Sequence, residues 1–321
     1  MRHSAKCLFI LLWAAVSVGC RSGPVSEILE LSGVARHGDR LVLVSDEKSG
    51  EILSCPLQPS KLQAIQVLEL PTLTPRSIEQ PLALDLESVG TLGDGQVVVL
   101  SERLRSLVDA SGVIAQYPEI YGELGNRGLE GLAIRQGAVN WVAVCWEGGF
   151  LQDKDLIPQL QDRLRHTALR PVVLIHRLAS QARPGRLSEF EAFEVHLPPH
   201  KDGYRSRMTD LVWQQFPDGA WGFIGLFSAE NPTVSGSARF KYRQLWRLRI
   251  DRDSGHIRPV GTPIDLDARI PELANANWEG LCWWEPGRQL ILCYDKFPPG
   301  KPRIAVLNLA VDDRDWLWQA D

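Results

Sequence analysis

The sequence predicts an all-β fold, a β-propeller of five four-stranded antiparallel blades, with six blades as the alternative. Three observations predict it. One short motif returns five times along the chain, each copy is a strand pair joined by a tight turn, and further strand-like runs follow the pairs. A β-sandwich would account for the strands but not for the fivefold return of the motif.

Each copy of the motif is a short apolar strand, a turn and a β-rich strand that ends in polar residues. The turns are rich in Gly, Pro and Asp, and Gly and Asp tolerate the positive φ angles of tight hairpins. The pairs cover residues 31–35 with 41–47, 86–89 with 97–103, 129–133 with 141–147, 208–212 with 222–230, and 278–282 with 290–296.

Further strands are expected to complete the blades. Clear runs lie at residues 171–178, 190–197, 244–250 and 303–309. The ring is expected to close through a strand at residues 25–31, or through residues 315–319.

The first residues indicate export. A short basic region precedes an apolar run at 8–18 that is too short for a comfortable membrane span. The residues that follow resemble a bacterial lipobox with Cys20 as the lipidated residue. Ser17 stands where a lipobox usually has an aliphatic residue. Two alternatives therefore remain, which are cleavage by the ordinary signal peptidase and a retained N-terminal membrane anchor. We expect a signal peptide at 1–19, a lipidated or flexible stretch at 20–24 and one propeller domain at 25–321, in the bacterial periplasm or at the outer membrane.

Composition limits the partners. The chain of 321 residues has a formal net charge of −4 and no basic stripe, which argues against a nucleic-acid partner. We also expect the protein to be a monomer. No CxxC pair occurs, so the cysteines do not suggest a zinc site. Buried free thiols are favoured over disulfides for the cysteines of the mature chain, which are Cys55, Cys145, Cys282 and Cys293.

One position of the motif always carries a side-chain oxygen. Its five residues, called the ring here, are Ser32, Glu87, Glu130, Thr209 and Glu279. The first strand of a propeller blade lines the central channel, so these side chains should converge at one height.

Three carboxylates at such a height would repel one another. At a separation of roughly 6 Å and an effective dielectric near 20, each pair costs about 3 kcal/mol. The repeat offers no basic residue at that height, so we expect a bound cation, with Ca²⁺ first because it accepts six to eight oxygen ligands in loose geometry. The alternative is that the glutamates contact only channel water.

The polar ends of the second strands should surround the same mouth of the channel. Long loops with many Lys and Arg residues should also lie there, which favours a small anionic substrate. A carboxylate at these ends could act as a general base, and a cation could steady negative charge. The candidate catalytic residues are Glu102, Arg103, Glu147, Glu230, Asp295 and Lys296.

Two family resemblances rest on these motifs. The x-Glu-Gly-Leu starts at Glu130 and Glu279 and the Asp-Leu-Glu at Glu87 resemble the phytase-like propellers, labelled esterase-like activity of phytase. That resemblance implies an exported propeller with phosphoester or ester hydrolysis. The ring order Ser, Glu, Glu, Thr, Glu is similar to that of the calcium-activated nucleotidases (apyrases), which implies a five-bladed propeller with a central Ca²⁺. Glu47 and Lys48 depart from the Asp-Arg-Thr-Gly stretch of that family.

The sequence thus predicts a calcium-dependent hydrolase of phosphoesters or other esters. A non-enzymatic, envelope-anchored scaffold with structural calcium is the alternative, and a lactonase-like metal propeller is a third.

Overall fold

The computed structural model describes most of the predicted propeller. The described residues are 30–46, 50–57, 66–69, 74–77, 84–122, 128–148, 170–178, 189–200, 202–231, 233–234, 240–274, 276–295 and 303–309. The predicted signal peptide, Cys20 and Lys296 lie outside them. No helix in these ranges is both long and apolar enough to cross a membrane.

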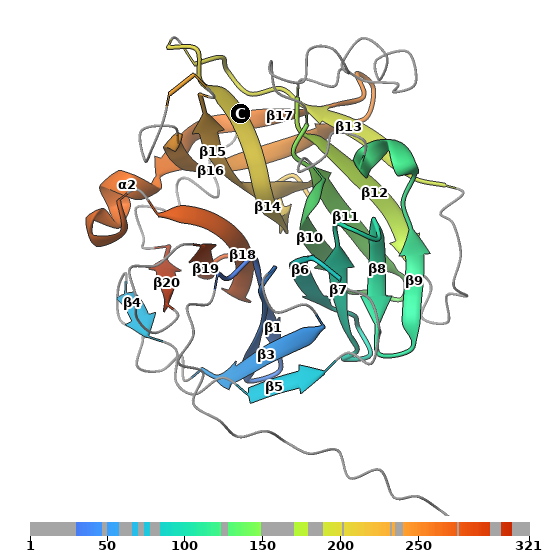
Figure 1. The fold of residues 1–321 in the computed structure, drawn as a ribbon. Coiled ribbons are helices and arrows are strands. Elements are labelled where there is room, and N and C mark those ends of the chain that lie inside the picture. Colours follow the sequence, from blue (N-terminus) through green and yellow to red (C-terminus); the bar gives the residue numbers. More distant parts are fainter. Residues whose placement is uncertain are drawn as a thin grey trace, which may run out of the picture.

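The described strands form five blades of four strands around a centre (Figure 1). The first blade is β1 (Gly33–His37), β2 (Arg40–Val44), β3 (Glu51–Pro56) and β5 (Thr74–Ser77), and the second is β6 (Leu86–Thr91), β7 (Val97–Ser101), β8 (Ser106–Asp109) and β9 (Gly112–Gln116). The third is β10 (Leu129–Arg135), β11 (Asn140–Trp146), β12 (Val172–Leu178) and β13 (Glu191–Val195). The fourth is β14 (Arg205–Gln215), β15 (Trp221–Glu230), β16 (Phe240–Asp251) and β17 (His256–Asp265), and the fifth is β18 (Asn277–Glu285), β19 (Gln289–Asp295), β20 (Arg303–Asn308) and β4 (Gln66–Glu69).

The first strands of the blades close the ring. Contacts run from β1 to β6, β10, β14, β18 and back to β1. Short helices lie outside the blades at η2 (Glu119–Gly122), α2 (Leu266–Arg269) and η5 (Pro271–Leu273). The fold is therefore the predicted β-propeller, with five blades.

The core consists of five hydrophobic clusters, one between each pair of neighbouring blades. Each blade buries both of its faces, so successive side chains of one strand enter different clusters. In β11, Val142 and Val144 pack toward the second blade, whereas Ala143 and Cys145 pack toward the fourth. This double burial explains why the second strands read as continuous apolar runs rather than as an alternation of apolar and polar residues.

The closure of the ring differs from the expected one. The fourth strand of the fifth blade is β4, which pairs antiparallel with β20. Of the two segments expected to close the ring, residues 25–29 and 315–319 lie outside the described residues. The chain leaves the first blade after β3, adds β4 to the fifth blade and returns to the first blade as β5. β4 lies in the sequence between two strands of the first blade but pairs in the fifth blade. It therefore links the two ends of the ring.

Cys55, Cys145, Cys282 and Cys293 are all buried and free, as predicted. Burial raises the pKa of the Cys55 thiol to about 11, with Arg40 opposing it, so this thiol is protonated and unreactive at neutral pH.

Candidate functional site

Four of the five ring residues sit on β-bulges. The pairing of the first strand with the second slips at Glu87, Glu130, Thr209 and Glu279, each of which has no partner residue on the second strand. Ser32 precedes β1 directly. A bulge inserts one unpaired residue and re-aims its side chain, and bulges are common next to active sites. The repeated motif is thus a repeated bulge, which sets one polar side chain per blade at one end of the channel.

The small residue after the ring position is required by a close approach of the inner strands. A Cβ added to Gly33 would lie 2.6 Å from the Cα of Ser88, and one added to Gly131 would lie 2.5 Å from the Cα of Asp210. A Cβ added to Gly280 would lie 3.0 Å from the Cα of Gly33. Neighbouring inner strands therefore approach one another closely at the residue that follows the ring position.

The three ring glutamates lie close enough for their charges to interact. The charge of Glu279 raises the pKa of Glu87, and the charges of Glu87 and Glu279 raise the pKa of Glu130. Thr209 donates a hydrogen bond from Oγ1 to the Trp278 carbonyl over 3.0 Å. Ser32 Oγ accepts the Asp46 amide at 3.1 Å.

The expectation that no basic residue lies at this height is wrong. Arg207, two residues before Thr209 on β14, has a side chain that is only 13% exposed and sits among three glutamates. Its Nε lies 2.5 Å from Glu147 Oε2, and its Nη2 lies 3.6 Å from Glu279 Oε2 and 3.8 Å from Glu130 Oε2. The motif of the fourth blade begins at residue 208, whereas β14 begins at Arg205 and carries Arg207 into the mouth.

Arg207 does not neutralise the mouth. Burial first, and then the charges of Glu102 and Glu279, raise the pKa of Glu87 well above its usual range. Burial also raises the pKa of Glu130, with Glu147 and Glu87 adding to it and Arg207 opposing it. Glu279 has a pKa of about 7, because burial outweighs the opposing charge of Arg207. The mouth holds more carboxyl groups than one guanidinium can balance.

The surplus carboxyl groups gather on one side of the mouth. Asp85, Glu87 and Glu102 each offer an oxygen within 4.8 Å of the others. Burial raises the pKa of Glu102 to about 7, and the charges of Asp85 and Glu147 add to the effect. Glu102 Oε1 is buried and has no hydrogen-bond partner among the described residues.

The backbone at Asp85 is also unusual. Its φ of 50° lies in the left-handed region, which non-glycine residues rarely adopt and which concentrates at functional sites. These three carboxyl groups, called the acidic triad here, are oxygen donors of the kind that Ca²⁺ takes.

The predicted catalytic residues separate into two groups. Glu102, Glu147 and Asp295 belong to the mouth, since Asp295 accepts a hydrogen bond from Asn277 at 3.1 Å and raises the pKa of Glu279. Glu230 ends β15 and is fully buried, but it is not among the charges that shift the described ring carboxyl groups. Arg103 is exposed.

Sequence reasoning missed Asp210, the residue after Thr209. It is 1% exposed, and its carboxylate accepts the amides of Leu132 at 3.1 Å, Leu211 at 2.9 Å and Leu281 at 2.6 Å. It therefore ties together the inner strands of three blades. The available signal was an Asp where three other copies of the motif carry Gly.

The opposite end of the channel is a cavity of about 730 Å³. Its lining includes Trp213, Trp221, Trp283 and Trp284 together with Arg36 and Arg135. The Arg135 guanidinium lies over three indole rings, 4.4 Å from the ring centroid of Trp221, 5.1 Å from that of Trp213 and 5.3 Å from that of Trp141.

No protein-family model and no curated protein match the chain. Solved structures similar to it include virginiamycin B lyase from Staphylococcus aureus, with 11% identity, a TM-score of 0.39, and 88% of this chain and 96% of that chain covered. A putative glycoside hydrolase from Parabacteroides distasonis has 10% identity and a TM-score of 0.43, with 87% of each chain covered. A gluconolactonase from Xanthomonas campestris has 10% identity and a TM-score of 0.34, with 88% of this chain and 87% of that chain covered. Likeness at these values carries no argument about chemistry.

Proposed function

We propose that the chain is an exported, calcium-binding hydrolase that cleaves small phosphoesters or other anionic esters at the acidic mouth of its channel. The observation that carries the proposal is Glu102. It is buried beside two further carboxyl groups. Burial first, and then neighbouring negative charges, raise its pKa to about 7 in the absence of a cation. A cation bound beside it would lower that pKa and keep the group ionised, the form that a general base needs.

A calcium ion fits the donors of the mouth. Asp85 and Glu87 would hold it, with the Ser32 hydroxyl nearby, because Gly33 packs directly against the backbone of Glu87 and Ser88. All of these donors are oxygens, which favours Ca²⁺ over zinc. A divalent cation would relieve the repulsion that raises the pKa of Glu87. When bound, calcium would polarise the scissile group of the substrate and acidify a coordinated water.

Arg207 limits which ring residues are available to hold the calcium ion. The full ring of Ser32, Glu87, Glu130, Thr209 and Glu279 was expected to hold the ion, but Glu130 and Glu279 share the guanidinium of Arg207. We therefore assign the ion to the triad side of the mouth. Glu102 would accept the proton of the attacking water, and Arg207 would fix the position of Glu147.

The substrate class follows from the charges and from the resemblances. A bound cation beside Arg207 favours an anionic group, and the ring order similar to the apyrases makes nucleotides worth including among the phosphoesters. We also propose export with lipidation at Cys20, a monomeric state and no nucleic-acid partner.

The test is a screen of nucleotides, aryl phosphates and carboxylic esters with the purified full-length chain, with and without Ca²⁺. We expect turnover that requires Ca²⁺ and a kcat at least about 100-fold lower for E102Q, the typical size of a general-base contribution. E285Q, at the far end of β18, is the control and should keep full activity. Absence of turnover throughout the panel with Ca²⁺ bound would reject the hydrolase.

A binding scaffold is the second candidate, and the cavity at the opposite end favours it. A concave site of about 730 Å³ with four tryptophans is of the size and composition that small ligands occupy. In that case calcium would only stabilise the fold, and D85N would weaken calcium binding without affecting capture of the ligand.

A further inference from the structure

The third and fourth blades are joined along their outer strands. β13 pairs in parallel with β17, with Glu194 opposite His256 and Val195 opposite Ile257, which merges the two blades into one eight-stranded sheet. The His196 amide extends the pairing with a hydrogen bond of 2.9 Å to the Ile257 carbonyl. No other two blades are joined in this way among the described strands.

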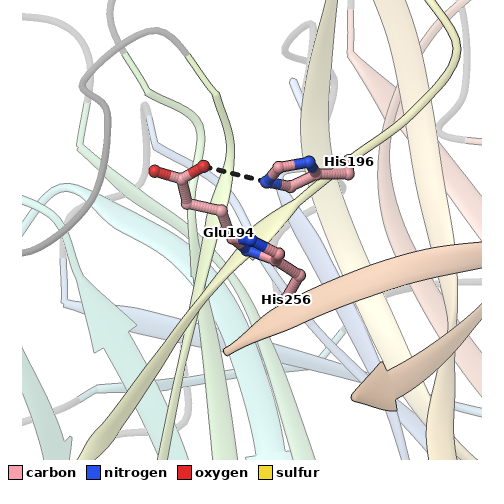
Figure 2. A group of neighbouring side chains, drawn as sticks. All are labelled: Glu194, His196 and His256. Carbon is pink, nitrogen blue, oxygen red and sulfur yellow. Dashed lines mark hydrogen bonds and ion pairs between the residues drawn. The ribbon is translucent and has the colours of Figure 1, made fainter. Parts of the chain in front are cut away.

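The seam gathers one carboxylate and two imidazoles, which Figure 2 shows. Glu194, His196 and His256 each offer a ligand atom within 4.8 Å of the others. Glu194 Oε2 lies 3.0 Å from His196 Nε2, and the two imidazole centroids are 3.9 Å apart. His256 Nδ1 is buried and has no hydrogen-bond partner among the described residues. A buried nitrogen in that state is available to a ligand.

The charges at the seam suit a cation. Glu194 is buried beside the two imidazoles, and carboxylate oxygens and imidazole nitrogens are both donors to divalent metal ions. Arg170 Nη1 lies 2.8 Å from His196 Nδ1 and 3.6 Å from Glu194 Oε2, so a cationic group already occupies this point. The Arg170 side chain is 47% exposed and can turn into solvent.

We propose that Glu194, His196 and His256 bind a first-row divalent metal ion, zinc first, which fastens the third blade to the fourth. Two imidazoles and one carboxylate are a donor set of zinc sites, whereas calcium takes oxygen ligands. Three protein ligands leave a fourth position for water. The ion would cross-link two outer strands whose backbones are joined by two residue pairs and the hydrogen bond of the His196 amide.

The site is independent of the acidic mouth in its chemistry. The acidic triad offers only oxygens and the seam offers two nitrogens, so the two sites select different ions. Excess Ca²⁺ should leave zinc at the seam, which separates this proposal from the calcium proposal.

The experiment is a zinc titration of the purified, metal-stripped full-length chain in competition with a chromophoric chelator, with Co²⁺ absorption as a report on nitrogen ligation. We expect one zinc ion per chain that excess Ca²⁺ does not displace, a higher unfolding temperature with zinc, and affinities at least about 10-fold lower in H196Q and H256Q. R170Q should bind zinc more tightly, because it removes a competing positive charge.

H37Q is the matched control, since His37 is a partly exposed histidine at the end of β1 in the first blade, and it should bind zinc like the parent. Equal zinc affinity in the parent, H196Q and H256Q would overturn the proposal, as would displacement of the zinc by Ca²⁺. If a histidine variant fails to fold, R170Q still tests the proposal. Zinc binding by R170Q that is unchanged or weaker than in the parent would count against the zinc site.

Discussion

The two ends of the central channel are built from the same five strands but are opposites in chemistry. At one end, bulges aim polar side chains inward and the strand backbones approach so closely that the motif needs Gly or another small residue. At the other end, the pairing is more regular and the strands enclose an aromatic cavity of about 730 Å³. The difference shows that the unpaired residues of four blades coincide with the charged end of the channel, whereas aromatic side chains line the other end.

Each end also contains an arginine held in a different way. Arg207 is 13% exposed and is surrounded by carboxylates, which raise its pKa although burial opposes its charge. Arg135 lies over indole faces, with its pKa lowered by burial. Carboxylates and aromatic faces are thus alternative partners for a guanidinium. The contributions of the two kinds of contact to the free energy of unfolding should differ by a measurable amount.

The largest effect should come from Arg207. R207M removes the partner of three buried glutamates, and leaving buried charges unpaired costs about 3–5 kcal/mol. We expect a loss of that size in the free energy of unfolding at pH 7, measured by urea denaturation. The loss should shrink at pH 5, because the raised pKa values of Glu130 and Glu279 leave these two groups with less charge there. A loss that is equal at both pH values would contradict the ion-pair interpretation.

The next effect is the dependence of stability on pH. Glu102 and Glu279 have pKa values of about 7 in the folded chain, against about 4.3 for an unfolded glutamate. The folded chain therefore binds more protons than the unfolded chain in that interval. Its free energy of unfolding should fall as the pH rises from about 4.5 to 7, by about 1–3 kcal/mol per group, and level off above that.

Urea denaturation across this pH range measures the slope. E102Q should make it shallower, whereas E285Q should leave it unchanged. An identical slope in E102Q and the parent would mean that Glu102 titrates normally, and the general-base role would lose its support.

Much of this comparison could be predicted from the sequence. The repeat located the five ring residues, because a bulged strand leaves a visible motif in which an oxygen-bearing residue precedes a small one. The ring closure could not be found, because β4 has four residues and pairs with a strand more than 200 positions away. The position of Arg207 in the mouth could not be predicted, because β14 begins three residues before the motif does. The seam of β13 and β17 has no signal in the repeat, since it depends on how outer strands meet.

A third prediction tests the close approach of the inner strands next to the ring. In G131A, the new Cβ would lie 2.5 Å from the Cα of Asp210 and 2.8 Å from Cys145 Sγ, so backbone must move. Overpacking of this kind costs about 1–3 kcal/mol in the free energy of unfolding. G137A is the control at the other end of the same strand pair, where the nearest atom would be 3.4 Å away, and it should be close to neutral. Equal stabilities of the two variants would show that the strands can separate freely at the ring.

The smallest effect should come from Arg135. R135M keeps much of the side-chain volume and removes a charge that lies over indole faces, an interaction worth about 0.5–1 kcal/mol at exposed sites. Arg135 makes no ion pair with a carboxylate among the described residues, so the loss should differ little between pH 5 and pH 7. The same urea titrations at both pH values measure it beside R207M. A loss for R135M as large as that for R207M would mean that the two ends hold their arginines equally strongly, and that the unpaired carboxylates are not what makes the acidic mouth sensitive.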